Sequence, residues 1–133
     1  MLDYPQVALD FMNRDHAEFV ASLDELLALL ARSDRIADVE AHLDQLLEHT
    51  RTHFAAEETA MRAAAFPPYP VHKGEHDRVL ADMQTRITDW RHSRNTDALR
   101  DWLQGTLSDW FVSHVGTMDF VTARFIAQMT PDR

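Results

Sequence analysis

Three kinds of residue or segment are scarce in this sequence, and each scarcity narrows the choice of fold and chemistry. The 133-residue chain contains no cysteine, which excludes disulfide bonds, iron–sulfur clusters and zinc sites built on thiolates. Glycine occurs only three times, whereas alanine and leucine, both strong helix formers, are abundant. No apolar run is long enough to cross a bilayer, so we expect no membrane insertion.

Charge and length indicate an ordinary globular protein of one domain, residues 1–133. The chain has 13 Lys and Arg against 22 Asp and Glu, a net charge of −9, which disfavours nucleic acid and anionic membranes as partners. A hydrophobic fraction of 45% is enough to bury one core. The first residues combine neither a basic start nor a long apolar stretch, so we expect no secretory signal and a cytoplasmic location.

Helical periodicity recurs in four stretches with short connections. Apolar residues spaced by three, four and seven indicate a helix over 6–32, and Ser33 and Asp34 can cap a second one that ends before Pro67. The proline-rich segment 66–70 cannot continue a helix. A third helix is expected over 71–91 and a fourth over 97–127, with Asn95 or Thr96 as its cap. The prediction is an all-α protein, an antiparallel up-down-up-down four-helix bundle.

Residues that commonly bind metal ions lie on all four predicted helices. The pairs His53/Glu57 and His72/His76 are each spaced by four, so each pair shares one helix face. Any one pair could equally be a solvated face or hydrogen-bonded core residues. These residues, however, lie early in the first and third predicted helices and late in the second and fourth. In an antiparallel bundle this alternation brings all of them to one end. We therefore predict a metal site formed by His16, His53, Glu57, His72, His76, His114 and Asp119.

One spacing in this set does not suit a regular α-helix. His114 and Asp119 are five residues apart, which turns their side chains away from each other. A local π-type bulge near Gly116 would bring them back to one face, and such bulges often occur at functional sites. We therefore expect irregular helix geometry between residues 114 and 119.

The spacing of these residues resembles the hemerythrin family, in particular the single-domain bacteriohemerythrins, over essentially the whole chain. The matching motifs are His16, His53-Phe54-x-x-Glu57-Glu58-x-x-Met61, His72-Lys73-x-x-His76 and Trp110-x-x-x-His114-x-x-x-x-Asp119. The resemblance implies two non-haem iron ions, bridged by Glu57, Asp119 and an oxo or hydroxo group. It implies His72, His76 and His114 on one iron and His16 and His53 on the other. One coordination position then stays open, on the iron with two histidines, for dioxygen.

This resemblance implies a protein that binds dioxygen reversibly, as a carrier or store. Ferritin-like di-iron oxygenases instead use Glu-x-x-His pairs, which are absent from the inferred ligand positions. Two alternatives remain, a sensor that responds to oxygen or redox state and a di-iron peroxide or nitric oxide reductase, whereas iron storage is disfavoured. Dioxygen is the expected ligand, an oxygen-consuming protein a candidate partner, and a monomer the expected state.

Apolar residues next to the inferred ligands are the candidates for an oxygen pocket. An aromatic residue at helical spacing is most often plain core, and only adjacency to the ligands favours a pocket role here. The candidates are Phe19, Phe54, Trp110, Phe111 and Val115. Phe111 is bulkier than the aliphatic residue that the family resemblance leads us to expect.

The chain departs from the family pattern at its first motif, and three polar residues near the inferred ligands have no role in that pattern. Asn13 stands where the family usually has aspartate, and Asp15 directly precedes His16. We expect His49 to be solvated, with a place beside His53 as the alternative. Glu58 and Lys73 are expected to be exposed or paired with each other.

Overall fold

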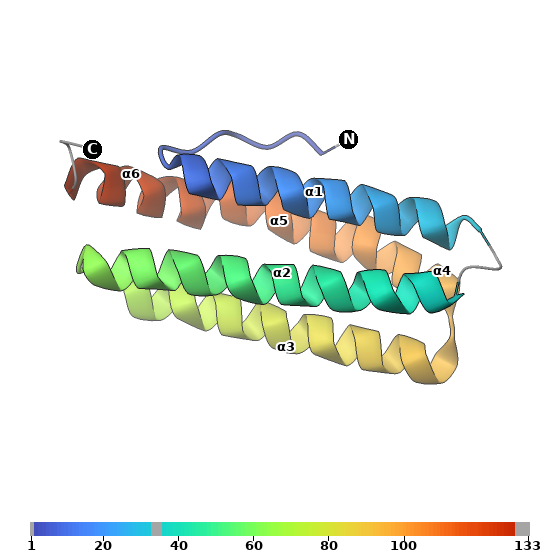
Figure 1. Cartoon of the computed structure of the whole chain (residues 1–133). Coiled ribbons are helices and arrows are strands. Elements are labelled where there is room, and N and C mark those ends of the chain that lie inside the picture. Colours follow the sequence, from blue (N-terminus) through green and yellow to red (C-terminus); the bar gives the residue numbers. More distant parts are fainter. Residues whose placement is uncertain (1, 33–35, 130–133) are drawn as a thin grey trace.

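The predicted four-helix bundle is the observed architecture. A computed structural model describes residues 2–32 and 36–129, and within these ranges four helical rods lie roughly antiparallel (Figure 1). The first three rods are α1 (Asp10–Leu30), α2 (Ile36–Ala63) and α3 (Tyr69–Ser93). The fourth consists of α4 (Thr96–Asp101), η1 (Trp102–Leu107), α5 (Ser108–His114), η2 (Val115–Asp119) and α6 (Phe120–Met129). None of the described helices has the length and apolar character needed to span a membrane.

The fourth rod departs from α-helical geometry in two places. The segment η2 is a π-helix, as expected between His114 and Asp119. A π-helix carries more residues per turn, so side chains five apart return to one face. The other π-segment, η1, was not predicted. At its end the Ser108 hydroxyl donates a hydrogen bond to the Leu103 carbonyl oxygen at 2.6 Å, five residues back.

Helix ends follow local chemistry, and several lie a few residues from the predicted positions. Asn95 caps α4, because its side chain accepts a hydrogen bond from the Ala98 N–H. The third helix begins at Tyr69 rather than Val71, since proline fits the first turn of a helix, where its missing N–H is not needed. The predicted caps Ser33 and Asp34 lie outside the described residues.

The predicted start of the first helix at Gln6 is wrong, because α1 begins only at Asp10. The residues before Leu9 run back beside α1 without helical structure (Figure 1). Asn13 holds this segment: its amide nitrogen donates to the Val7 carbonyl at 2.9 Å, and its side-chain oxygen accepts from the Val7 N–H at 2.8 Å. Tyr4 then packs edge-on against Phe111, with ring centroids 5.2 Å apart.

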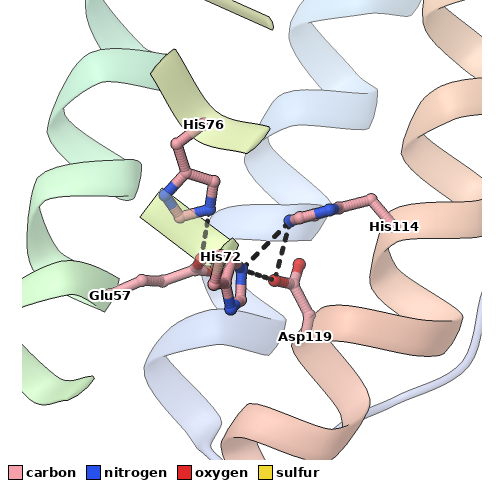
Figure 2. A group of neighbouring side chains, drawn as sticks. All are labelled: Glu57, His72, His76, His114 and Asp119. Carbon is pink, nitrogen blue, oxygen red and sulfur yellow. Dashed lines mark hydrogen bonds and ion pairs between the residues drawn. The ribbon is translucent and has the colours of Figure 1, made fainter. Parts of the chain in front are cut away.

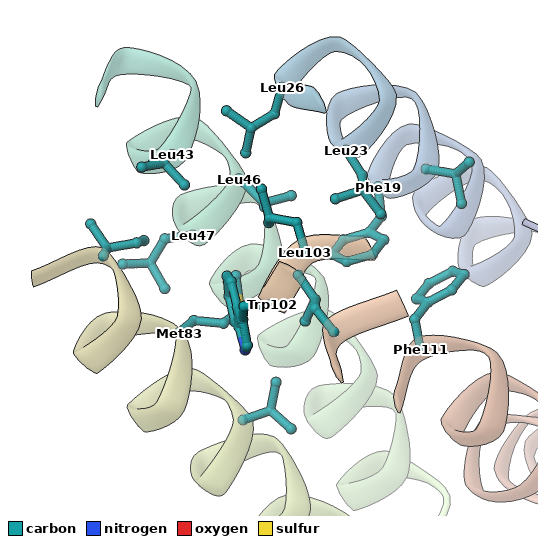
Figure 3. Packing of buried hydrophobic residues seen from close by; sticks show 14 of the residues in the cluster. Phe19, Leu23, Leu26, Leu43, Leu46, Leu47, Met83, Trp102, Leu103 and Phe111 are labelled. Atoms are coloured by element: carbon teal, nitrogen blue, oxygen red, sulfur yellow. The ribbon is translucent and has the colours of Figure 1, made fainter. Parts of the chain in front are cut away.

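Apolar side chains fill the bundle interior beyond the predicted metal ligands. Figure 3 shows residues of this core from all four rods. Leu26, Leu43, Leu46, Met83 and Leu103 are completely buried. Burial of one such side chain contributes about 1.5–3 kcal/mol, so this part of the bundle supplies packing energy that the polar part lacks.

The double contact of Asn13 predicts a measurable loss of stability on truncation. Asn13→Ala removes both hydrogen bonds to Val7 and leaves partly buried backbone groups unpaired, so the free energy of unfolding should fall by about 1–2 kcal/mol. Urea denaturation followed by circular dichroism measures this. Gln45→Ala, at an exposed position of α2, is the control and should change stability little. Equal stabilities of the two variants would contradict the role given to Asn13.

Candidate metal centre

The seven predicted ligands meet inside one end of the bundle. His16 comes from α1, His53 and Glu57 from α2, and His72 and His76 from α3. His114 ends α5 and Asp119 ends η2. All seven are buried, with exposed fractions between 0 and 8%. Two carboxylates among five imidazoles are costly to bury unless charges compensate one another, so this cluster requires an explanation.

Three histidines surround one side of the two carboxylates (Figure 2). His72 Nε2 and His114 Nε2 each lie 3.1 Å from Asp119 Oδ1. On the same side, His76 Nε2 lies 3.1 Å from Glu57 Oε1. These five residues can place one nitrogen or oxygen atom each around a common point.

The remaining two histidines face the other carboxylate oxygens. His53 Nε2 lies 2.6 Å from Glu57 Oε2, and His16 Nε2 lies 3.0 Å from Asp119 Oδ2. Glu57 and Asp119 therefore each present one oxygen to the three-histidine group and the other to the two-histidine group. Carboxylates divided in this way can bridge two metal ions.

Several ligand atoms have no suitable partner within the protein. Both oxygens of Glu57 and the Nε2 of His76 are buried and lack a hydrogen bond of acceptable geometry. His72 Nε2 and His114 Nε2 face each other at 3.2 Å, although each ring also points at Asp119. Two cations would satisfy all these atoms at once, and imidazole with carboxylate is a donor set that suits iron. The residues present therefore fit a two-metal centre.

Outer contacts orient three of the five imidazole rings. His53 Nδ1 lies 2.7 Å from Asp15 Oδ2, and His76 Nδ1 lies 2.9 Å from Glu58 Oε2. In His72 the partner of Nδ1 is the Thr122 hydroxyl, at 2.8 Å. Such contacts hold each ring so that Nε2 is free to bind a metal ion.

Glu58 and Lys73 were expected to be exposed or paired with each other. The pair does not form, and the Lys73 side chain is 40% exposed whereas that of Glu58 is only 14% exposed. Glu58 bonds to His76, and the Lys73 ammonium donates to Asp77 at 2.9 Å. The sequence offered no signal for Thr122, whose contact with His72 depends on how α6 packs against α3. For Asp15 and Glu58 the only signal was adjacency to His16 and Glu57.

Charge in the metal-free cluster shifts the titration of its members. Burial alone lowers the pKa of His53, but its hydrogen bonds to Glu57 and Asp15 outweigh burial and raise that pKa to about 9. For a carboxyl group burial acts in the opposite direction and raises the pKa. In Asp119, however, hydrogen bonds from His114, His16 and His72 outweigh burial and hold the pKa well below its usual range. The cluster therefore keeps the Asp119 carboxylate anionic and favours a proton on His53 in place of metal.

A small cavity of about 20 Å³ lies beside the two-histidine group. Its size suits one molecule not much larger than water. Its wall consists of His16, Phe19, His49, Thr50, His53, Phe54, Trp110, Phe111, His114 and Asp119. Four of the five predicted pocket residues are thus present, whereas Val115 is buried but does not line the cavity. His49 is only partly exposed and belongs to the wall, as does Thr50, which sequence reasoning missed.

Aromatic rings hold the wall and the ligands together. Phe54 stacks on His76 with centroids 3.8 Å apart, and Trp110 stacks on His114 at 4.6 Å. The Trp110 indole N–H donates to Glu75 Oε2 at 2.8 Å. Arg78, together with this indole, lowers the pKa of Glu75 to about 2, so the acceptor stays ionised at neutral pH.

Comparison with known proteins agrees with this geometry. The family described as the hemerythrin HHE cation binding domain matches residues 7–126. The bacteriohemerythrin of Ralstonia nicotianae is 39% identical over 99 residues, which cover 72% of this chain and 69% of the relative. The bacteriohemerythrin of Aquifex aeolicus is 31% identical over 114 residues, 86% of each chain. The myohemerythrin of Sipunculus nudus is 34% identical over 80 residues, 60% of this chain and 59% of that protein.

No solved structure matches the chain significantly. The family match nevertheless extends over nearly all of the four-helix bundle and includes every residue of the buried cluster. The chain belongs to the hemerythrin family.

Proposed function

We propose that this protein binds dioxygen reversibly at a di-iron centre, as a carrier or store rather than an enzyme. The observation that supports this most is the division of the carboxylate oxygens. Glu57 and Asp119 each turn one oxygen to the group of three histidines and one to the group of two. The small cavity lined by four of the predicted pocket residues adjoins the group that has fewer histidines.

In this proposal His72, His76 and His114 would hold one iron, His16 and His53 would hold the other, and Glu57 and Asp119 would each contribute to both. When bound, the irons would supply the electrons that dioxygen binding needs. The protein contributes a buried wall in which Phe19, Phe54 and Phe111 exclude water. A cavity of about 20 Å³ leaves no room for an organic substrate beside the oxygen, which favours carriage over oxidation.

We extend the proposal to the setting of the protein. Residues 1–133 act as one unit, a cytoplasmic monomer whose ligand is dioxygen and whose recipient is an oxygen-consuming protein. The acidic charge and the absence of cysteine support this setting.

Cycles of oxygen and argon test the function directly. The protein is loaded anaerobically with ferrous iron, iron per chain is measured, and visible spectra are recorded during repeated exchange of the gas. We expect two irons per chain and a charge-transfer band that appears under oxygen and disappears under argon. A band that forms once and persists under argon would refute carriage and support a redox sensor or reductase.

Removal of a predicted ligand should abolish binding of at least one iron. His72→Ala and His114→Ala each take one nitrogen from the three-histidine group, so iron per chain should fall below two. The iron-dependent gain in thermal stability should shrink as well, because metal binding is linked to folding. His42→Ala, which removes a histidine outside the cluster, is the control. Two irons in either ligand variant would show that the ligand assignment is wrong.

Iron binding should release a proton from His53. Because its pKa is raised to about 9, His53 is protonated in the metal-free protein at pH 8 and must lose roughly one proton to bind iron. Apparent iron affinity should therefore rise with pH up to about 9 and level off above it. Calorimetry in buffers of different ionisation enthalpy counts the protons. Asp15→Asn removes a group that raises this pKa, so it should release fewer protons at pH 8.

Phe111 should control oxygen kinetics without affecting metal content. Phe111→Leu enlarges the cavity beside Phe19, whose ring stacks on Phe111 with centroids 4.7 Å apart. Oxygen association and dissociation, followed by stopped-flow spectroscopy, should both become faster while iron stays at two per chain. Unfolding free energy should fall by about 1 kcal/mol through lost packing. Unchanged oxygen rates would place the oxygen route elsewhere.

A further inference from the structure

Two of the ten residues around the cavity also reach the protein surface. Eight of the lining residues are buried, and only His49 and Trp110 are partly exposed. Trp110 is held on both sides, since its ring stacks on His114 and its N–H donates to Glu75. A short route between solvent and the cavity that avoids buried residues therefore passes His49 or Trp110, and of these two Trp110 is the one held in place.

His49 is held much more weakly than Trp110. Its Nε2 lies 3.1 Å from Glu18 Oε1, and the two side chains are 28% and 55% exposed. Its other ring nitrogen, Nδ1, is buried without a hydrogen-bond partner. Exposed pairs of this kind contribute little to stability, and partly exposed side chains change rotamer within nanoseconds.

Movement of His49 need not disturb the predicted ligands. The outer contact of His53 is made by Asp15, at 2.7 Å, and not by His49. Thr50, the next residue of the wall, keeps its hydroxyl bonded to the Leu46 carbonyl oxygen at 2.7 Å. The His49 ring can therefore turn outward while the rest of the wall stays in place.

We propose that His49 is the gate through which small ligands enter and leave the cavity, and that Glu18 holds this gate closed. This gate rests on the proposed function in one respect, namely that the ligand passing through it is dioxygen. Opening the gate lowers the barrier to passage in both directions, so it changes the rates of entry and exit by the same factor.

A matched control pair lies on the same two helices. His42 Nε2 and Glu25 Oε2 are 3.4 Å apart, each seven residues along its helix from the gate pair. His42 does not line the cavity. His42→Ala and Glu25→Ala therefore remove the same kind of α1–α2 contact without opening the proposed route.

The first test measures azide binding to the diferric protein by stopped-flow spectroscopy. His49→Ala should raise the association and dissociation rate constants by the same factor, at least about twofold as expected for loss of an exposed pair. The dissociation constant should stay unchanged, and His42→Ala should leave both rates unchanged. A changed dissociation constant at an unaltered dissociation rate, or unchanged rates, would overturn the gate.

The second test needs no iron and so separates failure of the gate from failure of the proposed function. Dissolved oxygen quenches tryptophan fluorescence, and only Trp110 of the three tryptophans lines the cavity. Because Trp110 is also partly exposed, oxygen quenches it directly from solvent in every variant, and the difference between matched variants reports the gate. In metal-free protein shown to be helical by circular dichroism, His49→Ala and Glu18→Ala should raise the quenching constant. The variants His42→Ala and Glu25→Ala should not. Equal quenching in all variants would overturn the gate even if two irons bind and carry oxygen.

Discussion

The burial of two carboxylates among five imidazoles is the constraint on which the rest of this structure depends. Glu57 and Asp119 lie within the bundle, away from water. In the described part of the chain, the ion pairs that their oxygens form within 4 Å are all with histidine nitrogens. A proton on His53 compensates part of their charge in the metal-free protein, because the pKa of His53 is raised to about 9. Two metal ions would do so more completely, since they would also satisfy the buried oxygens of Glu57 and the Nε2 of His76.

Several irregular features of the bundle follow from this constraint. The π-segment η2 returns Asp119 to the face of His114, at the cost of regular hydrogen bonding in that turn. Phe54 and Trp110 stack on ligand histidines, and Asp15, Glu58 and Thr122 orient three of the rings. The apolar core around Leu46 and Leu103 is continuous with Phe54 and Phe111 beside the ligands, so its packing also supports the buried cluster. The same aromatic wall encloses the small cavity, so the residues that support the ligands also define what can reach them.

The sequence predicted the parts of the structure that depend on spacing along one helix. Periodicity indicated the four rods, and the alternation of early and late positions placed His16, Glu57, His72 and His114 at one end. The five-residue step to Asp119 even predicted η2, because a regular helix could not bring that carboxylate to the cluster. What could not be predicted depends on packing between elements. The non-helical segment before Asp10, held by Asn13, and the contact of His72 with Thr122 have no signal in local periodicity. The π-segment η1 carries no ligand, so no spacing pointed to it.

The central claim is that one cluster of seven side chains binds two irons and divides them between a three-histidine and a two-histidine group. Anomalous diffraction from crystals of the iron-loaded protein, measured on both sides of the iron absorption edge, tests it most directly. We expect two iron peaks per chain, one next to His72, His76 and His114 and the other next to His16 and His53, with Glu57 and Asp119 between them. A single peak, or iron bound at Asp15, Glu18 and His49 instead, would contradict it.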